Sequence, residues 1–174
     1  MDPQLHQLLI TRHTKEEMVA FLKKNPGIFT DLIRLSVSQD PPLNWRATWL
    51  LSTCMKKNDP KVQPAITHLI KAIPGKEDGH QRELLKVLLK MDLAEDQEGH
   101  LFDTCVRLWE KISKQPSVRH TAFRYIIKVL RKYPEIAQEI KVLTQDHFLA
   151  TLSPGIRSSI YKMIRQARLD SLPR

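Results

Sequence analysis

Glycine, cysteine and long apolar runs are all scarce in this chain. Its 174 residues include 5 glycines and 2 cysteines, and 6% of them are aromatic. Cys54 and Cys105 each sit among apolar residues of a helical pattern, so we expect buried thiols and no disulfide framework. No apolar stretch is long enough for a signal peptide or a membrane span. We therefore expect a cytoplasmic protein with no membrane partner.

The motifs that usually hold cofactors or carry out catalysis are also missing. The sequence has no Gly-x-Gly-x-x-Gly or P-loop pattern for nucleotides and no Gly-x-Ser-x-Gly nucleophile elbow. Its 7 histidines include no pair three or four residues apart, and no Cys-x-x-Cys motif accompanies them. The sequence therefore predicts no cofactor and no catalytic residue, and no metal site unless distant segments assemble one.

The chain does contain a series of amphipathic segments of helical length, punctuated by several of its 11 prolines. No segment sustains the period-two alternation that indicates a strand. Thr14 and Glu17 have the spacing of a capping box, and Asp59-Pro60 and Ser153-Pro154 are typical of helix starts. The sequence predicts an all-α protein with helices over residues 3–12, 14–24, 26–37, 42–57, 60–73, 78–91, 96–114, 117–132, 134–145 and 154–169.

Three of these helices begin with an apolar residue followed by an arginine, at Arg46, Arg119 and Arg157. Arg119 and Arg157 are 38 residues apart. The 73 residues between Arg46 and Arg119 are close to two such steps, with a degraded copy of the motif at residues 79–82. A period of roughly 35–40 residues with two helices per period is typical of HEAT or armadillo-like solenoids.

The stretch Asp-Pro-Pro-Leu-Asn-Trp-Arg-Ala over residues 40–47 resembles the HEAT pattern, in which Asp-Pro and a short gap precede apolar-Arg-x-Ala at the start of the second helix. The resemblance covers about residues 26–169 and implies a right-handed α-α superhelix of about four helical hairpins. It implies one HEAT-like domain over residues 1–174, with residues 1–25 as an N-terminal cap. It also implies that Arg46, Arg119 and Arg157 pack between consecutive repeats and have structural roles.

The helix that begins near Trp45 is apolar around most of its circumference, so we expect it to be central, with Trp45 and Trp49 packed in the core. Residues 45–51 are similar to a segment of small bacterial helical proteins that carry the label adenylosuccinate lyase. The lyase superfamily has a Ser-rich, Gly-containing loop that ends in Met-Pro-x-Lys-x-Asn, and no such stretch is found in this sequence. A lyase is therefore only the third hypothesis for function.

The formal net charge of +9 comes entirely from the C-terminal part of the chain. Residues 1–106 contain 14 Lys and Arg against 14 Asp and Glu, whereas residues 107–174 contain 14 against 5. A helical wheel of residues 118–133 has a basic face and an apolar face, and the last helix also has a basic face. The apolar face consists of Ala122, Phe123, Ile126, Val129, Leu130 and Tyr133. If the two helices are equivalent in successive repeats, both basic faces point the same way. The candidate binding residues are Arg124, Lys128, Arg131, Lys132, Lys162, Arg165 and Arg168.

Two functions follow as the main hypotheses. Solenoids build extended binding surfaces, so the first is a non-enzymatic scaffold module that recognises a protein or peptide, which predicts an exposed apolar or mixed groove. The second is a protein that binds double-stranded DNA through the basic face, as HEAT-like DNA-alkylation glycosylases do, which predicts one continuous exposed basic surface. The basic residues can also form an ordinary solvated helix face.

Overall fold

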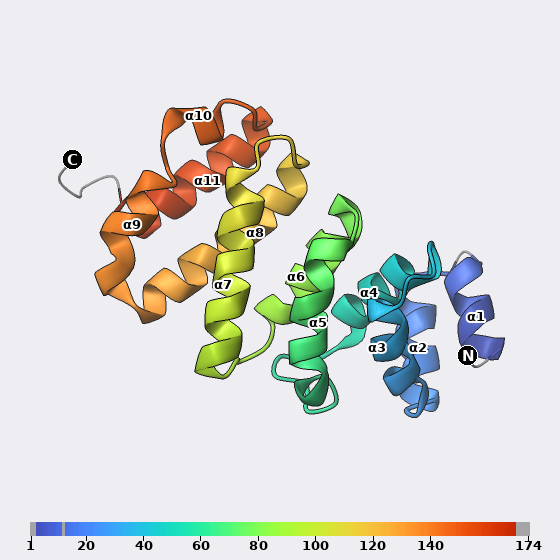
Figure 1. Cartoon of the computed structure of the whole chain (residues 1–174). Coiled ribbons are helices and arrows are strands. Elements are labelled where there is room, and N and C mark those ends of the chain that lie inside the picture. The colour runs from blue at the N-terminus through green and yellow to red at the C-terminus, as the bar shows by residue number, and fades with distance from the viewer. Residues whose placement is uncertain (1–2, 12, 170–174) are drawn as a thin grey trace. The chain divides into compact units, whose positions relative to one another are not determined.

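The computed structural model describes residues 3–11 and 13–169 of the chain. Within these residues it contains α-helices and short 3-10 helices but no β-strand, which confirms the all-α prediction (Figure 1). The chain divides into two compact units, residues 1–97 and 98–174, which are described separately below. None of the described helices is long and apolar enough to cross a membrane.

Unit 1 begins with four α-helices, followed by three shorter helical segments and a further α-helix. They are α1 (Pro3–Ile10), α2 (Lys15–Lys24), α3 (Ile28–Val37), α4 (Leu43–Cys54), η1 (Gln63–Ala65), α5 (Ile66–Ala72), η2 (Ile73–Gly75) and α6 (Asp78–Leu89).

Unit 2 contains most of one long helix, α7, which packs its apolar side inward, and the helices that follow it. They are α7 (Glu95–Glu110), α8 (Pro116–Lys132), η3 (Pro134–Ile136), α9 (Ala137–Val142), α10 (Asp146–Leu149) and α11 (Pro154–Gln166).

Local sequence signals explain where several helices begin. The predicted capping box is confirmed, because the Glu17 amide donates to Thr14 Oγ1 over 3.2 Å and the Thr14 amide donates to Glu17 Oε2 over 2.7 Å. The prediction of a helix from Pro60 is wrong. The Asp59 carboxylate instead accepts bonds from the amides of Lys56 and Lys61, which stabilises a turn, and helical structure begins at Gln63. The short helix α10 has no counterpart in the prediction.

The core of unit 1 surrounds α4, which packs against α1, α2, α3 and α6. This central position agrees with the apolar circumference of the helix. Trp49 is partly buried against the core, but Trp45 is 42% exposed, so the prediction that both tryptophans are core residues is wrong for Trp45. The buried cluster consists of Leu5, Leu8, Leu9, Met18, Leu22, Ile28, Leu32, Leu43, Ala47 and Leu50.

A buried histidine links α6 to the helices beside it. Nε2 of His80 lies 2.9 Å from the carbonyl oxygen of Ser36 and 2.9 Å from Thr48 Oγ1. The carbonyl can only accept, and the Thr48 hydroxyl donates to the Asn44 carbonyl, so Nε2 must carry a proton. Burial lowers the pKa of His80, and the charge of Lys76 acts in the same direction. The imidazole is therefore held in its neutral form.

Unit 2 is organised around a buried arginine and a buried tryptophan. Arg119 is fully buried, and its guanidinium donates to the carbonyls of Trp109 (2.9 Å) and Phe148 (2.7 Å) and to Thr151 Oγ1 (2.8 Å). The guanidinium carbon lies 4.8 Å from the centre of the Trp109 ring, which in turn packs against Phe123 at 4.5 Å. Burial lowers the pKa of Arg119, but the bonds hold it in its charged form.

The repeat becomes clearer in the structure than in the sequence. Arg46 donates to the Leu9 carbonyl and Arg157 to the carbonyls of Ala150 and Leu152, so both arginines bind backbone oxygens, as Arg119 does. Gln81 lies 38 residues before Arg119, is buried, and donates to the Ile73 carbonyl over 2.9 Å. Gln81 therefore occupies the repeat position at which the sequence motif is degraded.

Replacing Arg119 should destabilise the fold strongly. Arg119→Met leaves two buried carbonyls without their donor, and we expect the free energy of unfolding to fall by about 3–5 kcal/mol. Arg124→Met, on the exposed side of the same helix, should change it by less than about 0.5 kcal/mol. Urea denaturation followed by circular dichroism measures both, and equal effects of the two substitutions would contradict the structural role of Arg119.

The neutral state of His80 should make stability depend on pH. Above the unfolded-state pKa of 6.5 the imidazole is neutral in both states, so its contribution is constant. Below 6.5 the unfolded chain binds a proton that the folded chain excludes, so stability should fall, by at most about 1.4 kcal/mol per pH unit for this one group. The fall continues until the pH reaches the lowered pKa of the folded state.

Urea denaturation between pH 7.5 and 5.0 checks this expectation. We expect His80→Gln to show a smaller fall in the free energy of unfolding than the wild type over this range. His68→Gln, which alters an exposed histidine of α5, serves as the control and should follow the wild type. The expectation fails if His80→Gln keeps the full pH dependence of the wild type.

Candidate functional site

The basic residues of α8 form a stripe on its solvent side. Arg124 and Arg131 are exposed, and Lys128 is partly buried with its ammonium 6.0 Å from the centre of the Tyr125 ring. The spacing of i, i+4 and i+7 places the three on one side of the helix, over a length of about 10 Å. We call Arg124, Lys128 and Arg131 the α8 stripe.

The stripe is held in place by the apolar side of α8. This side is almost completely buried, which confirms the helical-wheel prediction for all its members except Tyr133, which is only partly buried. The structure buries even more of the helix than the wheel predicts, because Thr121, Tyr125 and Ile127 are also covered. The buried apolar residues that the wheel predicts are Ala122, Phe123, Ile126, Val129 and Leu130.

The two arginines of the α8 stripe carry charges that the described residues leave uncompensated. No carboxylate pairs with Arg124 or Arg131 among the residues that the structure describes. Lys132, which the sequence predicts as a binding residue beside the stripe, donates to Glu98 Oε1 over 2.8 Å. Its bonds to Glu98 and then to Tyr133 raise the pKa of Lys132. Lys132 is therefore engaged by α7, and its charge is partly neutralised.

The last helix brings one further cation beside the stripe. Helices α8 and α11 pack against each other and run in the same direction in Figure 1. Nε2 of His120 lies 2.9 Å from Ser159 Oγ, and burial together with the charge of Arg124 lowers the pKa of His120. Arg124 is one turn after His120, and Lys162 is one turn after Ser159. Lys162 therefore lies on the side of α11 that borders the α8 stripe.

The other two cations of the last helix lie elsewhere. Arg165 lines a hollow of about 460 Å3 together with Tyr161 and with Lys141 and Thr144 of the α9 end of the unit. Arg168 follows the end of α11, with a φ of 56°. Arg165 therefore lies toward α9 and not in the α8 stripe.

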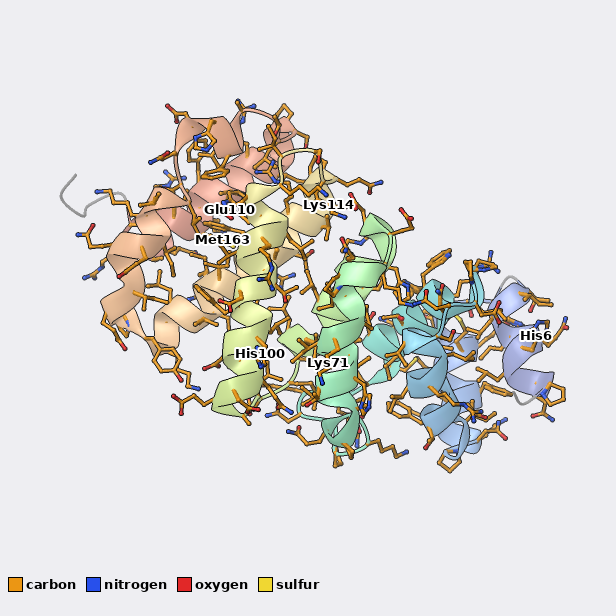
Figure 2. All side chains as sticks on the ribbon, viewed as in Figure 1. His6, Lys71, His100, Glu110, Lys114 and Met163 are labelled. Atoms are coloured by element: carbon orange, nitrogen blue, oxygen red, sulfur yellow. The ribbon has the colours of Figure 1, made fainter. Side chains whose placement is uncertain are left out.

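The histidines and cysteines of the described residues lie apart from one another. No group of three His, Cys, Asp or Glu side chains among the described residues could hold a metal ion. The labelled histidines His6 and His100 lie on α1 and α7, in different units (Figure 2). The Cys105 thiol is fully buried and burial raises its pKa, so it is protonated.

Sequence reasoning missed the exposure of Trp45. An apolar residue within a helix that is apolar on most sides is expected in the core, but Trp45 lies at the first turn of α4, where the neighbouring helices leave it uncovered. The adjacent Arg46 guanidinium lies 5.6 Å from the centre of its ring. The sequence signals for exposure are the position of Trp45 near the predicted helix start and the nearby prolines of residues 41–42.

Comparison with known proteins identifies the repeat. The model of the HEAT repeat domain matches residues 2–167, which is nearly the whole chain and spans both units. No curated protein and no solved structure matches the chain. The family match agrees with the all-helical structure and with the repeated polar side chain near the start of α4, α6, α8 and α11. This chain belongs to the HEAT repeat domain family.

Proposed function

We propose that this protein is a non-catalytic binding module that recognises an acidic helical segment of a partner protein on the α8 stripe. The observation that carries the proposal is the pair of exposed arginines, Arg124 and Arg131, for which no described carboxylate provides a partner. HEAT repeats generally mediate protein interactions, and stacked helices offer a regular surface for them.

The geometry of the stripe favours a helix as its partner. Cations at i, i+4 and i+7 match carboxylates spaced in the same way along an amphipathic helix. Lys162, on the neighbouring helix, adds a cation at the border of the stripe. Exposed ion pairs contribute about 0.2–1 kcal/mol each, so the stripe would orient the partner and speed its association more than it would hold it.

Duplex DNA fits the stripe less well. The α8 stripe is about 10 Å long and offers three cations, while Lys132 is paired with Glu98 and Arg165 lies toward α9. A protein that gains most of its affinity from phosphates usually makes more contacts than this, since non-specific binding is supplied by the sum of many such contacts. The nucleic-acid hypothesis is retained as an outcome of the test.

The test uses fluorescence anisotropy with labelled, Ala-rich helical peptides that carry three glutamates. In one peptide the glutamates follow the i, i+4, i+7 spacing and lie on one side of the helix. The other peptide has the same composition, but its glutamates lie on three different sides of the helix. We expect the first peptide to bind more tightly at low salt, with an affinity that weakens as salt is added. Arg124→Glu with Arg131→Glu should weaken its binding roughly tenfold.

The matched control reverses two exposed charges elsewhere in unit 2, by Arg107→Glu with Lys111→Glu, and should leave binding within about twofold of the wild type. Equal losses of peptide affinity in the two variants, or equal binding of the two peptides, would show that the stripe acts only as non-specific positive charge. Either result would contradict the proposal. Tighter binding of a labelled random-sequence duplex than of either peptide would replace the protein partner with nucleic acid.

A further inference from the structure

Trp45 is one of the few large apolar side chains that the described structure leaves open to solvent. It is 42% exposed at the first turn of α4, and Ile10, at the end of α1, is 45% exposed. A tryptophan that is partly uncovered retains apolar area that a ligand can bury, and such side chains supply much of the affinity of protein interfaces. The surface around Trp45 in unit 1 is therefore a candidate ligand-binding site.

On one side of Trp45 lies a hollow of about 610 Å3, which we call the polar hollow. Gly75 and Gly79 contribute to its wall, and a Cβ atom built on either glycine would meet no atom within 4 Å. The space beside both glycines is therefore open. The side chains of the polar hollow used below are Trp45, Lys76, Glu77 and Arg82.

The polar hollow has a cationic wall. Lys76 is 8% exposed, and its ammonium donates to the carbonyls of Val37 and Ser38. Within the described part of the chain, this buried positive charge is therefore met by dipoles and not by a carboxylate. Burial lowers the pKa of Lys76.

The second cation of the polar hollow is Arg82. Its guanidinium lies 3.0 Å from Glu83 Oε1, but Glu83 is shared with Lys86 at 2.9 Å, so one carboxylate serves two cations. Glu77 is the one acidic residue in the wall. The local balance therefore favours an anionic group of the ligand.

On the other side of Trp45 lies a hollow of about 420 Å3, which we call the apolar hollow. It is formed by α1, α2 and α4 and includes the exposed side chain of Ile10. Its apolar lining residues are Leu8, Leu9, Ile10, Met18, Trp49 and Leu50. Thr11, His13, Trp45 and Arg46 also line this hollow, and the Arg46 guanidinium is held by the Leu9 carbonyl. The Trp45 indole therefore borders a mainly apolar space on one side and the polar hollow on the other.

We infer that the surface around Trp45 binds a short peptide segment that carries a bulky apolar side chain beside a carboxylate. The apolar side chain occupies the apolar hollow against Trp45, and the carboxylate enters the polar hollow toward Lys76 and Arg82. Charge complementarity and the paired hollows support this occupant. The site lies wholly in unit 1, so it goes beyond the α8 stripe of unit 2 and stands without it.

The probes are two tetrapeptides, acetyl-Leu-Ala-Phe-Glu-amide and its neutral counterpart acetyl-Leu-Ala-Phe-Gln-amide, added at millimolar concentration. The readout is the indole N–H signal of Trp45 in 1H–15N NMR spectra, assigned among the 3 tryptophans with Trp→Phe variants. We expect the Glu peptide to shift this signal in a saturable way, and the Gln peptide to bind at least threefold more weakly.

Three variants separate binding from folding. Trp45→Ala should abolish binding. Because this variant lacks the Trp45 indole signal, its binding is followed through peptide-induced shifts of other signals. Gly79→Leu fills the polar hollow without removing a contact, replaces a glycine within a helix, and should weaken binding at least tenfold while the protein stays folded. Tyr161→Ala removes an aromatic side chain of equal exposure, 42%, in unit 2 and should have no effect.

The NMR titrations can support or contradict the proposed Trp45 site. No shift of the Trp45 signal with either peptide, or unchanged binding in Gly79→Leu, would overturn the inference. Equal binding of the Glu and Gln peptides would overturn the role of Lys76 and Arg82. The Arg124→Glu and Arg131→Glu variant should bind these tetrapeptides normally, so failure of the α8 stripe and failure of the Trp45 site are distinguishable.

Discussion

The fold depends on finding hydrogen-bond donors for backbone carbonyls near the ends of short helices. The C-terminal end of every helix leaves carbonyls without intrahelical partners, and in a chain of short helices such ends are frequent. Arg46, Gln81, Arg119 and Arg157 each extend from near the start of a helix and donate to carbonyls of neighbouring segments. Arg119 binds two carbonyls and a hydroxyl while fully buried, so the packing of unit 2 is built around it.

These hydrogen bonds involve one side of each helix and leave the opposite side to face solvent. In α8 the buried side holds Arg119 and the apolar core, and the exposed side presents Arg124 and Arg131. One helix thus contains arginines with two different roles, because burial and backbone partners fix one kind and solvent surrounds the other. Counting charges treats them alike, and only the bonds of each guanidinium separate a structural arginine from one that is available to a ligand.

The two units offer chemically different surfaces. Unit 1 has 14 Lys and Arg against 12 Asp and Glu and presents an exposed indole between two hollows, whereas unit 2 has 14 against 7 and presents a regular stripe. The polar groups of unit 1 are largely internal, since His80, Ser36 and Thr48 bond to one another or to nearby backbone. The proposed binding surface of unit 1 therefore combines an apolar part with a cationic part, and that of unit 2 is mainly cationic.

The sequence by itself determined the all-α class, most helix positions, the HEAT family and the amphipathic division of α8, because these follow from local spacing. Only the tertiary structure decided that Gln81 takes the place of a repeat arginine, that Glu98 engages Lys132, that Arg165 lies toward α9 and that Trp45 is uncovered. Each of these depends on residues distant in the chain that approach only after folding, and helical periodicity carries no information about such neighbours.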